Sequence, residues 1–367
     1  MIKDKKHIAI CSTSYYEYDR RLQRIAHSLT TNGYKVTWVS RQKDGDSKKL
    51  TFVEHHIIKT NNNRGPSFYK EYNDKINAAL IKIKPDIINS VDLDTIIGCS
   101  KAQRKLKCSI THDAHEIYYE VPELIGKPIK KSIWKLIAKK YLPTVKTNYT
   151  VNHSLKKHYE TKYGQTYEVI RNLPSKTQIS RTHSATRTNI KRLIYLGVIN
   201  QGRGIEIAIE AMRKLPDYHL QLVGEGDDYT KLVEVAKGLS NVEFLGFQHP
   251  AHLSSILFQA SIGLNILQAE SLNYRLSLAN KFFDYMHAGL PSINMAYPEY
   301  QHILEAHRVG VMIDSYDVPA LISGIRKLEN VNLFTELHSN TASARANYTW
   351  EREQQKLLQL YNGLTNL

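Results

Sequence analysis

Long apolar runs are missing from this sequence. None of its 367 residues lies in a stretch that approaches the roughly 20 apolar residues of a membrane-spanning helix. Residues 1–6 are mostly charged and precede a predicted strand, which is unlike the apolar core of a signal peptide. Apolar residues still make up 42% of the chain, enough for two cores of ordinary size. We therefore expect a cytoplasmic protein with two domains.

Cysteine is also scarce. The three cysteines, Cys11, Cys99 and Cys108, lie in or beside apolar segments, and their spacing fits no metal site. This usage is typical of a reducing compartment, where cysteines serve in core packing.

Acidic residues are in short supply in one half only. Residues 1–171 hold 32 Lys and Arg against 17 Asp and Glu, whereas residues 172–367 hold 18 of each. The whole net charge of +15 therefore lies in the first half. This asymmetry indicates an anionic surface or ligand for one domain, such as an anionic membrane, a phosphorylated acceptor or a nucleic acid.

Apolar runs alternate with helical periods in both halves. Residues 7–12 and 34–39 predict strands on either side of a helix, and residues 192–197 begin a second series after a Ser- and Thr-rich linker at 175–190. Such units build doubly wound parallel sheets, which bind ligands at the carboxyl ends of their strands. The sequence thus predicts two Rossmann-like α/β domains, at 1–172 and 173–348, followed by a helix within 349–367 that packs back toward the first domain.

Polar residues follow the predicted strands of the first half. Asp113, His115 and Glu116 follow the strand that begins at 108, and Arg20 lies in the loop after the first strand. We expect these four side chains on the acceptor side of a cleft. The alternatives are a solvated Arg20 and a loop histidine bonded to Asp113.

Asp92 and Asp94 form an Asp-x-Asp pattern after the strand at 85–90. Two such aspartates can hold a divalent cation. The pattern is short and common, so we expect Asp94 to cap the next helix instead.

A basic amphipathic helix is predicted within residues 126–146. Ile129, Ile133, Trp134 and Ile137 form one apolar stripe at helical spacing. This pattern suits an anionic membrane surface, and it equally suits a helix packed on its own sheet. Lysines surround the stripe at positions Lys127, Lys130, Lys131, Lys135, Lys139, Lys140 and Lys146.

The most informative stretch is residues 277–291, SLANKFFDYMHAGLP. It predicts a helix that ends near Gly289, since Pro291 cannot continue it. Lys281 and Asp284 fall on one face in the first turns. A helix start with a lysine suits a phosphate, and a carboxylate one turn deeper can accept two hydrogen bonds from a sugar diol. An ordinary amphipathic helix is the alternative.

This stretch resembles the donor-binding signature of retaining glycosyltransferase family 4, a family with the GT-B fold. The resemblance implies that Asp284 binds the ribose hydroxyls, at a position where Glu is usual. Ser277, Asn280 and Lys281 fit a Ser-x-x-Asn-Lys pattern found in part of the family. Leu276 stands where many members have a second Glu that contacts the sugar, and Glu270 is a candidate substitute.

The resemblance extends over most of the chain, most strongly from residue 194 to residue 314. It implies that Arg203 and Lys281 stabilise the departing diphosphate and that His115 lies close to the transferred sugar. Glycine-rich turns in the second half resemble the family's donor-binding loops. The donor-site glycines implied in this way are Gly202, Gly204, Gly224 and Gly246.

Together these features predict a GT-B enzyme that moves a sugar from a nucleotide-sugar to a glycan or lipid-linked acceptor with retention of configuration, in cell-envelope polysaccharide assembly. No cofactor and no bound metal are expected. The enzyme would be cytoplasmic, peripheral on the inner face of the membrane through residues 126–146. Two alternatives are a sugar-nucleotide epimerase or hydrolase of the same fold, and a basic nucleic-acid-binding protein, for which no known motif is present.

Overall fold

The computed structural model describes residues 6–42, 50–176 and 191–365. The chain divides into two compact units, which we call unit 1 (Met1–Asn172 with Glu353–Leu367) and unit 2 (Leu173–Arg352). Most of the predicted linker, residues 177–190, lies outside the described residues. Within the described part of the chain, no helix combines the length and apolar composition that crossing a membrane requires.

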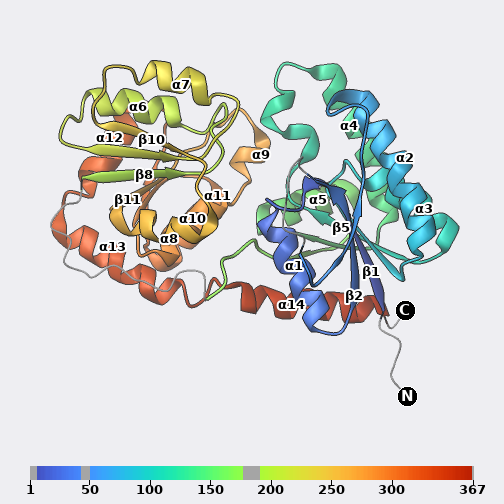
Figure 1. Cartoon of the computed structure of the whole chain (residues 1–367). Helices are drawn as coiled ribbons and strands as arrows, with labels where there is room; N and C mark the ends of the chain where they lie inside the picture. The colour runs from blue at the N-terminus through green and yellow to red at the C-terminus, as the bar shows by residue number, and fades with distance from the viewer. Residues whose placement is uncertain (1–5, 43–49, 177–190, 366–367) are drawn as a thin grey trace. The chain divides into compact units, whose positions relative to one another are not determined.

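Unit 1 is built on a seven-stranded sheet with the order β3-β2-β1-β4-β5-β6-β7 (Figure 1). All paired strands are parallel, and the order reverses between β1 and β4, which is where a doubly wound sheet binds ligands. The strands are β1 (His7–Tyr15), β2 (Lys35–Arg41), β3 (Glu54–Ile57), β4 (Ile87–Val91), β5 (Ser109–Ala114), β6 (Thr147–Thr150) and β7 (Tyr167–Val169).

Helices cover both faces of this sheet (Figure 1). On one face, α2 (Gly65–Ile83) and α3 (Ile96–Leu106) share a core with β1, β2 and β4, which includes the free cysteines Cys11 and Cys99. The other helical elements of the unit are α1 (Arg20–Thr31), α4 (Pro128–Tyr141), α5 (His153–Tyr163) and the short 3₁₀ turns η1 (Tyr118–Glu120), η2 (Pro122–Leu124) and η3 (Leu142–Thr144).

The last helix, α14 (Trp350–Thr365), joins unit 1 from residue 353 onward. The Tyr361 hydroxyl lies 3.4 Å from that of Tyr149 on β6. The Tyr34 hydroxyl donates to Asn362 Oδ1 at 2.7 Å. Unit 1 is therefore assembled from two segments that are far apart in the sequence.

Unit 2 contains a six-stranded parallel sheet with the order β10-β9-β8-β11-β12-β13. Its strands are β8 (Arg192–Leu196), β9 (His219–Val223), β10 (Val242–Gly246), β11 (Ile262–Asn265), β12 (Ser292–Met295) and β13 (Gly310–Ile313). Its helices are α6 (Ile205–Arg213), α7 (Tyr229–Val235), α8 (Pro250–Gln259), α9 (Leu272–Arg275), α10 (Asn280–His287), α11 (Pro298–His307), α12 (Val318–Lys327) and α13 (Val331–Ala344). The predicted fold class, two doubly wound α/β domains, is confirmed.

A short helix, α9, precedes α10. The helix predicted from residues 277–291 is present, and Gly289 follows it with φ +76°. The polar segment before it is also helical, because Ser271 caps α9 by accepting a hydrogen bond from the backbone of Tyr274.

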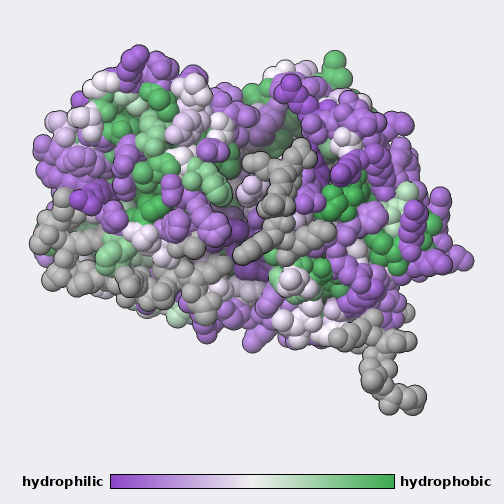
Figure 2. All heavy atoms as spheres, viewed as in Figure 1, coloured by the Kyte–Doolittle hydropathy of each residue, from purple (hydrophilic) through white to green (hydrophobic). Residues whose placement is uncertain are grey.

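The apolar residues of α4 do not form the single stripe that the sequence predicts. Trp134 packs edge-on against Tyr69 and Tyr118, with ring centroids 4.9 and 4.7 Å away. Ile129 and Leu136 point the other way and are 77% and 66% exposed. Figure 2 shows hydrophobic residues among hydrophilic ones at the surface in the upper part of unit 1, where Figure 1 places α4. The helix therefore packs on its own unit and also presents an apolar face to solvent.

Candidate active site

The start of α10 carries Lys281 and Asp284, which are both buried. The turn before the helix is held by neighbouring side chains. The Tyr300 hydroxyl accepts the N–H of Ala279 at 2.9 Å, and Ser277 Oγ donates to the Tyr274 carbonyl at 2.8 Å. The helix N-terminus is therefore held in a defined place, with its first N–H groups available to an anion.

The Lys281 ammonium is buried and has no hydrogen-bond partner among the described residues. Its Nζ lies 3.5 Å from the ring centroid of Tyr195 on β8. Burial and the nearby charge of Arg203 hold the pKa of Lys281 well below its usual value. Leaving a buried ammonium without a partner is unfavourable, so the site is built to gain an anion.

Arg203 lies in the loop between β8 and α6, flanked by Gly202 and Gly204, both with φ +75°. A β-carbon at Gly204 would lie 2.7 Å from Ile266 Cβ, so packing as well as φ requires glycine there. The guanidinium lies 4.9 Å from the Tyr274 ring centroid. The loop thus holds a second cation close enough to perturb Lys281.

Gly224 and Gly246 have separate backbone explanations. A β-carbon on Gly224 would lie 1.9 Å from the Gly197 carbonyl oxygen, so the two loops can meet only without a side chain. Gly246 has φ +62° and open space around it, with the Tyr229 hydroxyl 4.0 Å away. Their role in binding a base stays a prediction.

The other predicted donor-site residues lie nearby in the chain but differ in exposure. Asn280 is exposed as the first residue of α10, whereas Ser277 is half-buried. Glu270 is exposed in the segment between β11 and α9. Burial, with the Glu270 carboxylate, raises the pKa of Tyr297 to about 12, which places this carboxylate close to the start of α11.

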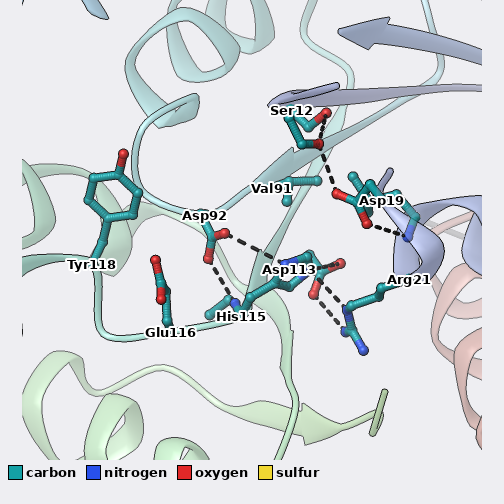
Figure 3. A network of polar contacts seen from close by, with 12 residues as sticks. Ser12, Asp19, Arg21, Val91, Asp92, Asp113, His115, Glu116 and Tyr118 are labelled. Atoms are coloured by element: carbon teal, nitrogen blue, oxygen red, sulfur yellow. Dashed lines mark hydrogen bonds and ion pairs between the residues drawn. The ribbon is translucent and has the colours of Figure 1, made fainter. Parts of the chain in front are cut away.

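In unit 1, a buried ion pair joins α1 to the end of β5 (Figure 3). Arg21 Nη2 donates to Asp113 Oδ1 at 2.8 Å, and Nη1 donates to the Ile170 carbonyl at 2.9 Å. The Arg21 and Asp113 side chains are 3% and 0% exposed. Burial would raise the pKa of Asp113, but the charges of Arg21 and His115 hold it well below its usual value.

His115 extends the network. Its Nε2 lies 3.0 Å from Asp113 Oδ2 and 2.9 Å from Arg21 Nε, and its backbone N–H donates to Asp92 Oδ1 at 2.8 Å. Burial alone would lower the pKa of His115, but the carboxylates of Asp113 and Asp92 raise it to about 9. The two carboxylates therefore favour the protonated ring. In this arrangement Arg21 Nε donates to His115 Nε2, so Nε2 is the accepting nitrogen, and the charge of Arg21 opposes protonation of the ring.

Asp92 and Asp94 lie beside this network, and the expected capping role of Asp94 is wrong. The N-cap of α3 is Thr95, whereas Asp94 Oδ2 accepts from Thr13 Oγ1 at 2.5 Å and from the Tyr118 hydroxyl at 3.2 Å. Burial raises the pKa of Asp94 to about 6 and that of Asp92 to about 8. Within the described residues, no group of three or more His, Cys, Asp or Glu is arranged to hold a metal ion.

Two family models match the sequence, one on each side of the boundary between the units. The model of "Glycosyltransferase Family 4" matches residues 19–173, and that of "Glycosyl transferases group 1" matches residues 190–330. The chain belongs to glycosyltransferase family 4. Compared by sequence with curated proteins, this glycosyltransferase has no match.

Solved GT-B structures share the fold of this glycosyltransferase. A sucrose-phosphate synthase from Thermosynechococcus elongatus is similar with a TM-score of 0.81 and 15% identity, over 99% of this chain and 100% of that one. HepE from Anabaena, solved with UDP and glucose, has a TM-score of 0.74 and 14% identity over 98% and 99%. WaaG, described as a glycosyltransferase involved in lipopolysaccharide biosynthesis, has a TM-score of 0.72 and 16% identity over 95% and 98%.

The structure of the glycosyltransferase groups the predicted residues unevenly. It brings Arg203 close to Lys281, and it brings His115 to Asp113. Arg20 is half-buried, while its neighbour Arg21 makes the ion pair. Helical spacing was the signal for this, because Arg21 lies four residues before the buried Ile25 and so belongs to the inner face of α1.

Residues that support the site also escaped the sequence reasoning. Asp92 was considered only as a metal ligand, yet it pairs with His115. Glu116 lies close enough to Asp92 to raise its pKa alongside burial, and Figure 3 shows both side chains next to Tyr118. In unit 2, the ring of Tyr195 lies against Lys281, a contact that no spacing in the sequence indicates.

Proposed function

We propose that this glycosyltransferase moves a sugar from a nucleoside-diphosphate sugar bound by unit 2 to an acceptor bound by unit 1. The observation that carries the proposal is the buried Lys281 ammonium at the start of α10, which has no hydrogen-bond partner in the part of the chain that the structure describes. A diphosphate would supply the missing bonds and the negative charge. The HepE structures contain UDP or UDP-glucose, which supports testing a uridine donor first.

The roles of the donor-site residues follow from their chemistry. Asp284 accepts hydrogen bonds from the ribose hydroxyls. Arg203 and Lys281, with backbone N–H groups of residues 272–281, stabilise the charge that develops on the departing diphosphate. Two cations supply the charge that a divalent metal would otherwise provide, so we expect activity without a bound metal or other cofactor.

Transfer would occur with retention of anomeric configuration. The bond between the anomeric carbon and the diphosphate oxygen breaks, and a bond to the acceptor oxygen forms on the same face. The acceptor proton passes to the leaving phosphate. We do not assign His115 as the base, because its Nε2 already accepts from Arg21 and its Nδ1 faces Asp92. It orients or stabilises the reacting groups instead.

The acceptor is a glycan or a lipid-linked sugar. Carboxyl groups gather at the ends of β4 and β5, where Asp92, Asp94 and Glu116 are close enough to influence one another. Carboxyl groups, whether protonated or ionised, suit sugar hydroxyls and offer no positive charge to a phosphate. We therefore infer that the reacting end of the acceptor is neutral. WaaG, described as involved in lipopolysaccharide biosynthesis, supports a place in cell-envelope polysaccharide assembly.

The anionic part of the acceptor or its membrane would meet α4. Ile129, Ile133 and Leu136 are exposed at helical spacing, and Lys139 and Lys140 are exposed in the last turn. An exposed apolar face bordered by lysines suits the surface of an anionic bilayer. We propose that the enzyme is peripheral on the inner face of the cell membrane.

A charge-reversal pair tests this location. The Lys139→Glu, Lys140→Glu variant should bind vesicles of phosphatidylglycerol and phosphatidylcholine about tenfold or more weakly, since each lysine contributes about 1 kcal/mol at such a surface. Arg104→Glu, Lys105→Glu makes the same charge change in the last turn of α3 and is the matched control. Lys131 and Lys135 are poorer probes because both pair with Glu120. Equal binding by both variants would end the membrane proposal.

Thermal unfolding with UDP, GDP, ADP, CMP and dTDP, without metal, tests the donor site. A ligand at about a hundred times its dissociation constant stabilises the native state by about 2.7 kcal/mol. We expect one diphosphate to do so, and Asp284→Ala to abolish both the stabilisation and transfer. No response to any nucleotide would contradict the proposed donor site.

Product analysis separates the alternatives. A transferase releases nucleoside diphosphate and a glycosylated acceptor, and the product NMR couplings give the anomeric configuration. Free sugar or an epimerised sugar-nucleotide without acceptor would indicate the hydrolase or epimerase. A salt-sensitive RNA gel shift that competes with nucleotide-sugar would favour the nucleic-acid-binding alternative.

A further inference from the structure

Tyr195 is not among the residues assigned above to substrates, yet its ring contacts Lys281. Lys281 Nζ is 3.5 Å from the centre of the Tyr195 ring, which is closer than the other cation–ring contact of this site, Arg203 on Tyr274 at 4.9 Å. The ring presents its negative face to a buried ammonium for which residues 6–42, 50–176 and 191–365 supply no hydrogen-bond acceptor. The two cations of the site thus both lie against tyrosine rings.

The Tyr195 ring is itself firmly held. Its hydroxyl donates to the Val198 carbonyl at 2.6 Å, across the turn that contains Gly197. The next residue, Leu196, donates its N–H to the Tyr285 hydroxyl on α10 at 3.0 Å. The Tyr285 hydroxyl also donates to the Ile194 carbonyl at 3.3 Å, so α10 is bonded to β8 on both sides of Tyr195 along the strand.

We propose that Tyr195 is a positioning residue whose ring holds the Lys281 ammonium in place, charged and without a counter-ion, until a diphosphate binds. This inference rests on the proposed donor site and adds a residue to it. A carboxylate in the same place would hold the lysine more tightly, but it would also repel the diphosphate and compete with it. A neutral ring attracts the ammonium and opposes no incoming anion.

The charged and titratable groups around Lys281 define what its titration reports. Arg203 comes from the loop before α6 and Tyr195 from β8, while Tyr274 and Glu206 lie near Tyr195. Arg203 opposes the charge on Lys281, and the Tyr195 ring favours it. Weakening the ring should therefore lower the pKa of Lys281 further and narrow the pH range in which the site attracts anions.

The decisive experiment changes the electrons of the ring and leaves its shape. Tyr195→Phe removes the hydroxyl and keeps the electron density of the ring face. Trifluorophenylalanine at position 195 keeps the ring shape and withdraws electron density from its face. Lysine labelled with ¹³C at Cε reports the Lys281 titration by NMR in the absence of ligand, with Lys281→Met to assign the signal. Calorimetry with UDP from pH 6 to pH 10 reports binding.

We expect the fluorinated variant to lower the pKa of Lys281 by about 1 relative to Tyr195→Phe and to weaken UDP binding about tenfold near pH 8. Tyr195→Phe should remain close to the wild type, which would show that the ring face acts and not the hydroxyl. Identical titration and binding in the two variants would overturn the proposal.

Failure of the donor site gives a different result. If the wild type binds no UDP or other nucleoside diphosphate, the proposed function fails, yet the ligand-free NMR titration still decides whether the ring supports Lys281. Tyr218→Phe, a change at another buried tyrosine of unit 2, is the control for general destabilisation and should leave both measurements unchanged.

Discussion

The two units treat their buried charges in opposite ways. In unit 1, Arg21 and Asp113 form a buried pair, and His115 takes its place between Asp113 and Asp92. In unit 2, Lys281 is buried against a ring and has no hydrogen-bond partner among the described residues. A network of paired charges stabilises the fold that holds it, whereas an ammonium without an acceptor among the described residues gains its missing bonds from a ligand. The charges of unit 1 are thus paired within the protein, whereas the buried ammonium of unit 2 is placed to bind an anion.

Removing one buried cation from each unit tests this contrast most directly. Arg21→Met would leave Asp113 buried without its counter-ion, so unit 1 should lose about 3–5 kcal/mol of unfolding free energy. Urea unfolding of the full chain, with hydrogen exchange to resolve the two units, measures this loss. Arg20→Met is the control and should change the stability by less than about 0.5 kcal/mol. Equal effects of the two variants would show that the buried pair is not special.

Removing a buried cation from unit 2 should raise the stability of that unit, in contrast to unit 1. Lys281→Met removes a buried ammonium that has no acceptor, so unit 2 should become more stable without ligand. Diphosphate affinity should fall about 10- to 150-fold, because a charged hydrogen bond contributes about 1.5–3 kcal/mol. Thermal unfolding and calorimetry measure the two effects. Lys191→Met, at a partly exposed lysine paired with Asp217, is the control and should change neither the stability nor the diphosphate affinity. A loss of stability in Lys281→Met would contradict this account.

Raising the pH should change the stabilities of the two units in opposite directions. The folded pKa of His115, about 9, exceeds its ordinary value of 6.5, so its contribution to unit 1 is fully present below pH 6.5 and is lost as the pH rises through 9. Asp92, raised to about 8, acts in the same direction. The pKa of Lys281 is depressed, so unit 2 should gain stability as the pH rises.

Hydrogen exchange between pH 6.5 and pH 9 measures this divergence, with a slope for one group of at most about 1.4 kcal/mol per pH unit. His115→Gln should flatten the dependence in unit 1 and leave unit 2 unchanged. Parallel pH dependence in the two units would contradict the charge assignments.

The smallest expected effect concerns how unit 2 holds its site. Tyr285→Phe removes the hydroxyl that accepts the Leu196 N–H, so unit 2 should lose about 1–2 kcal/mol in thermal unfolding. Tyr229→Phe, at a half-buried position, is the matched control and should have little effect. A diphosphate affinity that falls with the stability would show that this hydroxyl also aligns β8 with α10.

Much of the fold could be predicted because its signals are local. The strand at 7–12 and the helix ending before Gly289 each depend on a few adjacent residues, and the structure contains both. The 129–137 segment shows the limit. Periodicity gives a helix there, but it does not say that Trp134 turns inward onto Tyr69 and Tyr118 while Ile129 faces solvent.

The candidate site was harder to predict because its contacts join distant segments. Arg21 and Asp113 are brought together by strand order, and the sequence around either residue does not indicate its partner. Asp94 illustrates the same difficulty, since a local capping rule was applied to a side chain whose partners are Thr13 and Tyr118. Lys281 was singled out because its predicted role depends on its position in a helix, whereas its contact with the Tyr195 ring was not predicted.

The return of the chain to unit 1 at residue 353 has a consequence for synthesis. Unit 2 is continuous from Leu173 to Arg352, so all its strands can pair before the final helix has left the ribosome. Unit 1 begins first but lacks the Tyr361 and Asn362 contacts to Tyr149 and Tyr34 until translation ends. The half of the protein that is made first should therefore be the last to reach its full stability, which reverses the usual order of folding from the N-terminus.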